Sequence, residues 1–135
     1  MAISNSNQLI GKGFIKESAG CAVLNEGTIF FEALPSKKIK FTINNQRFYC
    51  DKNGKPIKNF SKTISQKEFS DFIDKLENLL STKAERKKDF ISHNAKISIH
   101  LPLKNRVIDK ILSDVDTYNF DAISELINKF ILTFS

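Results

Sequence analysis

Alternating apolar and polar residues mark several short strands along the chain, and the cleanest alternation runs from Lys96 to Leu101. A strand with this period has one dry face and one wet face. The apolar face would consist of Ile97, Ile99 and Leu101, and the polar face of Lys96, Ser98 and His100. Pro102 has no backbone N–H to donate to a ladder, so the pattern predicts that the strand stops there.

Two stripes at helical spacing follow this strand. The apolar positions of the first are Leu103, Val107, Ile108, Ile111, Leu112 and Val115, and those of the second are Ile123, Leu126, Ile127, Phe130, Ile131 and Phe134. The spacing predicts two helices, with Asp121 as the N-cap of the second and Asn119 in a left-handed turn before it. Because a lone short strand has no partner inside this unit, we expect it to pair with a second copy.

Residues 14–60 are rich in strand signals. The predicted strands are Phe14–Lys16, Cys21–Leu24, Thr28–Glu32, Lys38–Asn44 and Gln46–Cys50, with a tight turn at Asn44-Asn45. Ser65 and Glu68 have the spacing of a capping box, which predicts the start of an amphipathic helix. We interpret this region as a scaffold or dimerisation sheet, or else as a sheet that binds an effector or a partner.

The charge of the chain is unevenly distributed. The 135 residues carry a net charge of +6. Residues 83–110 hold eight Lys or Arg against three Asp or Glu, whereas residues 111–135 hold one against four. A basic zone around the strand at 96–101 would attract a phosphate backbone, although a solvated lysine-rich surface has the same composition.

Several kinds of site are disfavoured by the sequence. Cys21, Cys50, His93 and His100 have no metal-ligand spacing, and Gly11-Lys12-Gly13 lacks the rest of a dinucleotide fingerprint. A Cys–His nucleophile pair has no support beyond the presence of the residues, so we predict neither an enzyme nor a cofactor. No run is long enough to cross a membrane and no secretory signal is visible, which favours the cytoplasm.

The C-terminal third resembles the ribbon-helix-helix family of DNA-binding proteins. The resemblance rests on KISIHLP, LKNRVIDKIL and AISELINKF, within residues 96–134. In that family two chains pair their strands into an antiparallel ribbon that lies in the major groove. The chain departs from the family at Asp121 and Ala122, where Ser or Thr is common, and at Asn119, where Gly is frequent.

The resemblance implies a set of site residues. Lys96, Ser98 and His100 would contact bases, and protonation of His100 would make binding sensitive to pH. Phosphates would be held by Lys104, Arg106 and the helix start at Asp121, Ala122 and Ile123, with Lys87 and Lys88 added from the charged segment before the strand. The dimer core would consist of Ile97, Ile99, Leu101, Ile108, Leu112, Leu126, Ile127 and Phe130.

The sequence therefore predicts an α+β protein in three parts. Residues 1–81 would form a β-rich domain with one amphipathic helix, 82–94 a charged linker or helix extension, and 95–135 a ribbon-helix-helix unit in an intertwined homodimer. The expected function is sequence-specific binding of double-stranded DNA, as a transcriptional repressor or a plasmid or mobile-element accessory factor, with higher assembly on DNA left open. The alternative is a protein–protein adaptor or small chaperone in which the strand at 96–101 only dimerises.

Overall fold

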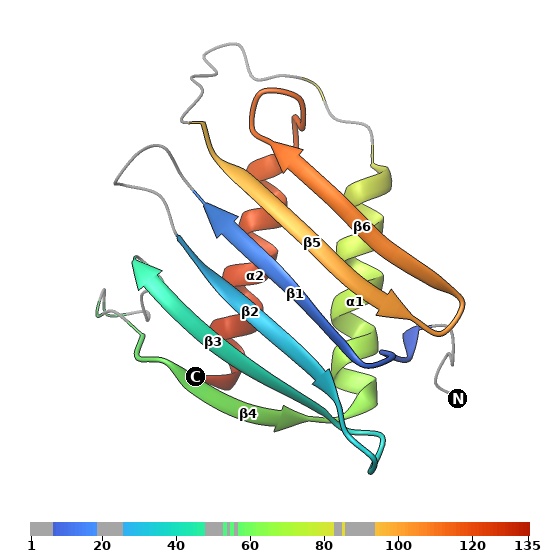
Figure 1. Cartoon of the computed structure of the whole chain (residues 1–135). Helices are drawn as coiled ribbons and strands as arrows, with labels where there is room; N and C mark the ends of the chain where they lie inside the picture. Colours follow the sequence, from blue (N-terminus) through green and yellow to red (C-terminus); the bar gives the residue numbers. More distant parts are fainter. Residues whose placement is uncertain are drawn as a thin grey trace.

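One antiparallel sheet carries two helices on one of its faces (Figure 1). The computed structural model describes residues 7–18, 26–47, 53, 55, 57–82, 85 and 94–135. The elements in chain order are β1 (Lys12–Ser18), β2 (Glu26–Ala33), β3 (Ile39–Arg47), β4 (Phe60–Ile64), α1 (Gln66–Ser81), β5 (Lys96–Leu103), β6 (Arg106–Ser113) and α2 (Phe120–Phe134). Within the described residues the sheet has six strands in the order β4-β3-β2-β1-β5-β6.

The core lies between the sheet and the helices. Every second residue of the central strands is buried, so that Ile15 of β1 lies opposite Ile29 of β2 and Ile99 of β5. Phenylalanines fill the space between these strands and the helices. The rings of Phe72 in α1 and Phe130 in α2 have centroids 4.3 Å apart. Burial of these apolar surfaces is the main force that holds both helices against one face.

The two amphipathic helices predicted at 65–80 and 123–134 are present. The Ser65 hydroxyl accepts a hydrogen bond from the Glu68 backbone N–H at 3.1 Å, and the Glu68 carboxylate accepts one from the Ser65 backbone N–H at 3.0 Å. The capping box is therefore confirmed. The N-cap of α2 is Asn119 and not Asp121, and Asn119 has φ −100°, outside the left-handed region.

The prediction of a ribbon-helix-helix unit in an intertwined dimer is wrong. β5 pairs with β1 on one side and with β6 on the other, so both of its edges are occupied within one chain. It has no free edge to offer a second copy. The regions 1–81 and 95–135, expected as separate units, share this sheet and one hydrophobic core.

The residues expected to form a dimer core lie in the core of a single chain. Six of them are buried there, and two are half-buried against the same cluster. The buried ones are Ile97, Ile99, Leu101, Ile108, Ile127 and Phe130, and the half-buried ones are Leu112 and Leu126.

The predicted helix over 103–115 is instead the strand β6. A two-residue turn, Lys104-Asn105, returns the chain so that Leu103 pairs with Arg106 and Ile97 with Leu112. The apolar stripe contains the adjacent pairs Val107-Ile108 and Ile111-Leu112. Such pairs fit a helix, but they also fit a strand with apolar residues on both faces.

Pro102 lies within β5 and does not end it. The carbonyl oxygen of Pro102 accepts a hydrogen bond from the Ile10 N–H at 2.8 Å, on the β1 side. Because the N and O atoms of a residue in an antiparallel strand point the same way, the missing N–H also faces that side. The β1–β5 pairing ends at Phe14 and His100, before Pro102. The missing N–H of Pro102 therefore removes no hydrogen bond from the β5–β6 ladder.

The N-terminal strands are shifted from the predicted ones. β3 runs straight through Asn44-Asn45 to Arg47, so the turn and the separate strand from Gln46 are wrong. β4 was not predicted. It pairs with β3, and Ser61 of β4 lies opposite Thr42 of β3. The predicted strand at 21–24 and most of the predicted linker at 82–94 fall outside the described residues.

Candidate nucleic-acid interface

The face of the sheet opposite α1 and α2 is covered by no described element (Figure 1). We call it the open face. Its side chains are those that alternate with the buried positions: Lys12, Phe14, Lys16, Thr28, Phe30, Glu32, Lys40, Thr42, Asn44, Ser61, Thr63, Lys96, Ser98, His100, Pro102, Val107, Asp109 and Ile111. In an antiparallel sheet with one face packed on the core, the alternate side chains point to the other face and are free to be polar or aromatic.

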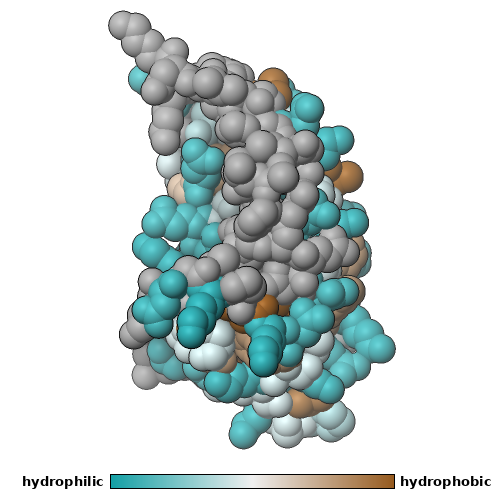
Figure 2. Space-filling model, turned by 90° about the vertical axis from the view of Figure 1, so that its left-hand side faces the viewer, coloured by the Kyte–Doolittle hydropathy of each residue, from teal (hydrophilic) through white to brown (hydrophobic). Residues whose placement is uncertain are grey.

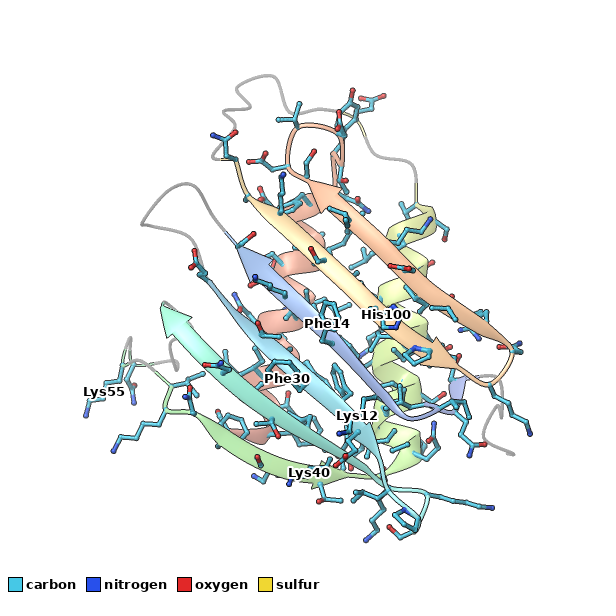
Figure 3. All side chains as sticks on the ribbon, in the orientation of Figure 1. Lys12, Phe14, Phe30, Lys40, Lys55 and His100 are labelled. Carbon is cyan, nitrogen blue, oxygen red and sulfur yellow. The ribbon has the colours of Figure 1, made fainter. Side chains whose placement is uncertain are left out.

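An aromatic row crosses the middle of the open face. Phe30 of β2 lies directly opposite Phe14 of β1, and Phe14 lies directly opposite His100 of β5. The rings of Phe14 and His100 have centroids 5.9 Å apart, and Figure 3 shows the three side chains from adjacent strands. Phe30 is 47% exposed although it is large and apolar. The row therefore presents aromatic surface to solvent in the centre of the sheet.

Lysines surround Phe30 at the diagonal positions. On β1 the residues diagonal to Phe30 are Lys12 and Lys16, and on β3 they include Lys40. Diagonal neighbours in a sheet lie about 7–8 Å apart, which long side chains span. Glu32 lies opposite both Lys12 and Lys40, and its carboxylate is 3.6 Å from the Lys12 ammonium. The positive charge beside Phe30 is thus only partly neutralised.

A hollow of about 260 Å³ lies beside the aromatic row. It is lined by Lys12, Gly13, Phe30, Phe31, Glu32, Lys40 and Thr42. Lys12 of β1, Phe30 of β2 and Lys40 of β3 are labelled in Figure 3. An aromatic wall with two ammonium groups is suited to a planar ring that carries a nearby anion.

The predicted base-contacting residues all lie on the open face. His100 takes part in the aromatic row, and its Nδ1 is 3.9 Å from a carboxylate oxygen of Asp109 on β6. Ser98 lies opposite Lys16, and Lys96 lies opposite Ser18 and Ser113 at the far end of the same face. The predicted wet face of the strand is therefore the solvent side of the sheet.

The predicted phosphate-contacting residues are not gathered with them. Arg106 lies on the helix side of β6, where its guanidinium donates to both carboxylate oxygens of Glu77 and to the Asn7 side-chain oxygen. The hydrogen bond to Glu77 raises the pKa of Arg106 above its ordinary value, since it stabilises the cation. Lys104 lies in the β5–β6 turn.

The start of α2 also lies away from the open face. Asp121 and Ala122 are exposed and Ile123 is buried, in the helix layer behind the sheet (Figure 1). The Ile123 N–H already donates to the Asn119 carbonyl at 3.2 Å. Lys87 and Lys88 fall outside the described residues.

Phe14, Phe30, Lys12 and Lys40 are the open-face residues that sequence reasoning missed. Phe14, Phe30 and Lys40 lie in strands that were predicted, whereas Lys12 precedes the predicted strand Phe14–Lys16. The alternation of Ile15, Ile29 and Phe31 as buried residues would have placed Phe14 and Phe30 on the other face. The sequence did not reveal the register between β1 and β2, which places Phe14 opposite Phe30. These two strands are separated in sequence by residues 19–25.

Seen from the side of β3 and β4, the coloured part of the surface contains many hydrophilic residues together with some hydrophobic ones (Figure 2). Among the residues that the structure describes, no three His, Cys, Asp or Glu side chains could hold a metal ion together. None of the described helices is long and apolar enough to span a membrane.

Comparisons of the chain with protein-family models, with curated proteins and with solved structures found no match.

Proposed function

We propose that this chain binds single-stranded nucleic acid on the open face. The observation that carries the proposal is the pair Phe14 and Phe30, directly opposite each other on adjacent central strands with lysines at the diagonals. Unpaired bases stack on exposed aromatic rings, and ammonium groups hold the backbone that links the bases. His100 extends the row by one more ring.

The geometry favours a single strand over a duplex. Bases inside a duplex are stacked on each other and offer no free π-face, whereas unpaired bases do. Entry into the major groove needs a helix or a two-stranded ribbon, because the groove is about 12 Å wide. The sheet has six strands at a spacing of about 4.8 Å, which makes it roughly 24 Å across. β5 is an inner strand of that sheet and does not form a ribbon.

The test is the affinity of the intact chain for fluorescent twelve-nucleotide strands of DNA and RNA, measured by anisotropy. The critical variant is Phe14→Ala with Phe30→Ala. Each base stacked on an aromatic side chain contributes about 1–3 kcal/mol. Loss of two such contacts should therefore raise Kd by at least ~30-fold.

The matched control is Ile10→Ala with Leu132→Ala, which removes two exposed apolar side chains outside the aromatic row. This control should bind like the wild type. Equal affinity of the Phe14 and Phe30 variant and the wild type, with both folded by circular dichroism, would refute the proposal. Failure of the wild type to bind any strand at low salt would refute it as well.

A duplex of the same sequence serves as the competitor. We expect it to displace the single strand only at much higher concentration, since it offers phosphates but no free bases. Equal competition would mean that the lysines act alone and that the aromatic row has no part in recognition.

A further inference from the structure

β6 is an edge strand, and half of its backbone hydrogen-bonding groups point away from the sheet. Among the described residues it pairs with β5 alone. The Asp114 N–H donates to the Ala95 carbonyl at 3.1 Å, so the even-numbered residues of this segment direct their backbone groups toward β5. The N–H and C=O groups of Val107, Asp109 and Ile111 therefore point away from the sheet.

The same edge carries exposed apolar side chains. Ile111 is 76% exposed and Val107 is 54% exposed. Proteins usually protect a sheet edge by making the strand short or by placing proline or charges along it. β4, the other edge, has five residues, whereas β6 has eight and contains no proline. β6 also carries Arg106, Asp109 and Lys110, so another strand can pair with this edge only in registers that these charges allow.

We infer that β6 pairs with β6 of a second copy of this chain, antiparallel and centred on Ile111. Pairing about a two-fold axis joins residues whose backbone groups both point outward, so odd-numbered residues meet odd-numbered ones. Within β6, three registers pair three or more outward-facing residues, with centres at 109, 110 and 111. Charge decides between them.

Two of these registers place like charges directly opposite each other, which is destabilising. A centre at 109 opposes Asp109 to itself, and a centre at 110 opposes Lys110 to itself. A centre at 111 opposes Ile111 to Ile111, Asp109 to Ser113 and Lys110 to Leu112. It covers the most exposed apolar side chain and opposes no like charges.

The pairing would join two sheets edge to edge with both open faces on the same side. A single strand of nucleic acid could then cross from one aromatic row to the other; this consequence alone rests on the proposed function. A strand–strand contact buries less surface than the ~1,600 Å² of a standard interface, so the dimer should be weak and concentration-dependent.

The test is sedimentation equilibrium of the full chain without nucleic acid, over a range from low to high micromolar. The wild type should approach twice the 15.4 kDa chain mass as concentration rises. Ile111→Lys should remain at the mass of one chain while its circular dichroism is unchanged. Leu132→Lys, the matched change at a 37% exposed position on α2, should behave as the wild type.

A wild type that stays at the mass of one chain throughout would overturn the inference, and so would an Ile111→Lys variant that dimerises equally. Because no nucleic acid is present, either result is separate from the fate of the proposed function.

Disulfide trapping tests the register. In a background where Cys21 and Cys50 are changed to Ser, Ile111→Cys should form a covalent dimer under mild oxidation much faster than Val107→Cys. Faster trapping through Val107→Cys would overturn the centre at Ile111.

Discussion

Glu32 is an open-face residue whose negative charge opposes the function we propose. It lies between Lys12 and Lys40, directly opposite both, and it pairs with Lys12 at 3.6 Å. The pair is exposed, so it contributes little to stability. A phosphate that approaches these lysines must compete with this carboxylate.

Removal of that charge should strengthen binding. We expect Glu32→Gln to lower Kd for a single strand by about 2- to 5-fold. This range corresponds to about 0.5–1 kcal/mol, the usual strength of an exposed ion pair. Anisotropy titrations at low salt measure the effect. Glu26→Gln, which changes a carboxylate at the other end of β2, is the control and should have a smaller effect; an unchanged Kd for Glu32→Gln would place the bound phosphates elsewhere.

Arg106 illustrates the opposite case, a charged residue used for structure. Its guanidinium joins Glu77 of α1 to Asn7, and the Asn7 amide donates to Asp74 at 2.7 Å and to the Ser70 hydroxyl at 2.9 Å. Asn7 is buried, so its polar atoms depend on these partners. The network fastens α1 to the β5–β6 hairpin and to the residues before β1.

Substitution of Arg106 should therefore destabilise the fold. We expect Arg106→Met to lower the free energy of unfolding by about 1–3 kcal/mol, because it leaves Glu77 and Asn7 without their donor. Urea denaturation followed by circular dichroism measures this. Lys67→Met removes the exposed Lys67–Asp71 pair and should change stability by less than about 0.5 kcal/mol. Equal effects of the two changes would contradict the network's role.

At the scale of the elements, the contact of β1 with β5 decides the architecture. It inserts the β5–β6 hairpin beside the N-terminal strands and brings His100 next to Phe14. Gly13 permits the close approach, since a Cβ at this position would lie 2.5 Å from the His100 carbonyl oxygen. The contact is with backbone, which has little room to move.

Gly13→Ala should separate β1 from β5. We expect a loss of about 1–3 kcal/mol in the free energy of unfolding, typical of overpacking in a tight site. Gly11→Asn is the control, because nothing lies within 4 Å of a Cβ there and Asn tolerates the φ of +72°. Thermal or urea unfolding of both variants compares them, and a Gly13→Ala protein as stable as the wild type would show that the two strands tolerate a wider spacing.

At the scale of the whole molecule, the net charge of +6 matters less than where the lysines lie. Arg106 is bound on the helix side, whereas Lys12, Lys16 and Lys40 surround Phe30. Only cations on the open face can neutralise phosphates of a strand that stacks on the aromatic row. Lys96 lies at the far end of this face, so counterion release should mainly reflect the three lysines around Phe30.

The salt dependence of binding measures how many phosphates these lysines neutralise. Three phosphate contacts to a single strand predict a slope of about −2 in a plot of log K against log salt. Lys12→Gln with Lys40→Gln should reduce the magnitude of the slope by about 1.4. Lys67→Gln with Lys75→Gln on α1 leaves the open face unchanged and should keep the wild-type slope. A slope that responds equally to both double variants would mean diffuse attraction by the whole surface.

The sequence by itself determined the features that depend on near neighbours. The alternation of Ile97, Ile99 and Leu101 identified both faces of β5, and the Ser65–Glu68 capping box marked the start of α1. These signals are local because a strand's period and a helix's first turn involve residues only a few positions apart.

Only the tertiary structure decided which strands are neighbours. The apolar pairs at 107–108 and 111–112 suit a helix and a two-faced strand equally, and pairing with β5 selects the strand. Phe14, Phe30 and His100 become one row through registers that join residues 16 and 86 positions apart. Such contacts depend on the packing of the whole core, and a short stretch of sequence contains no record of the partner that it will meet.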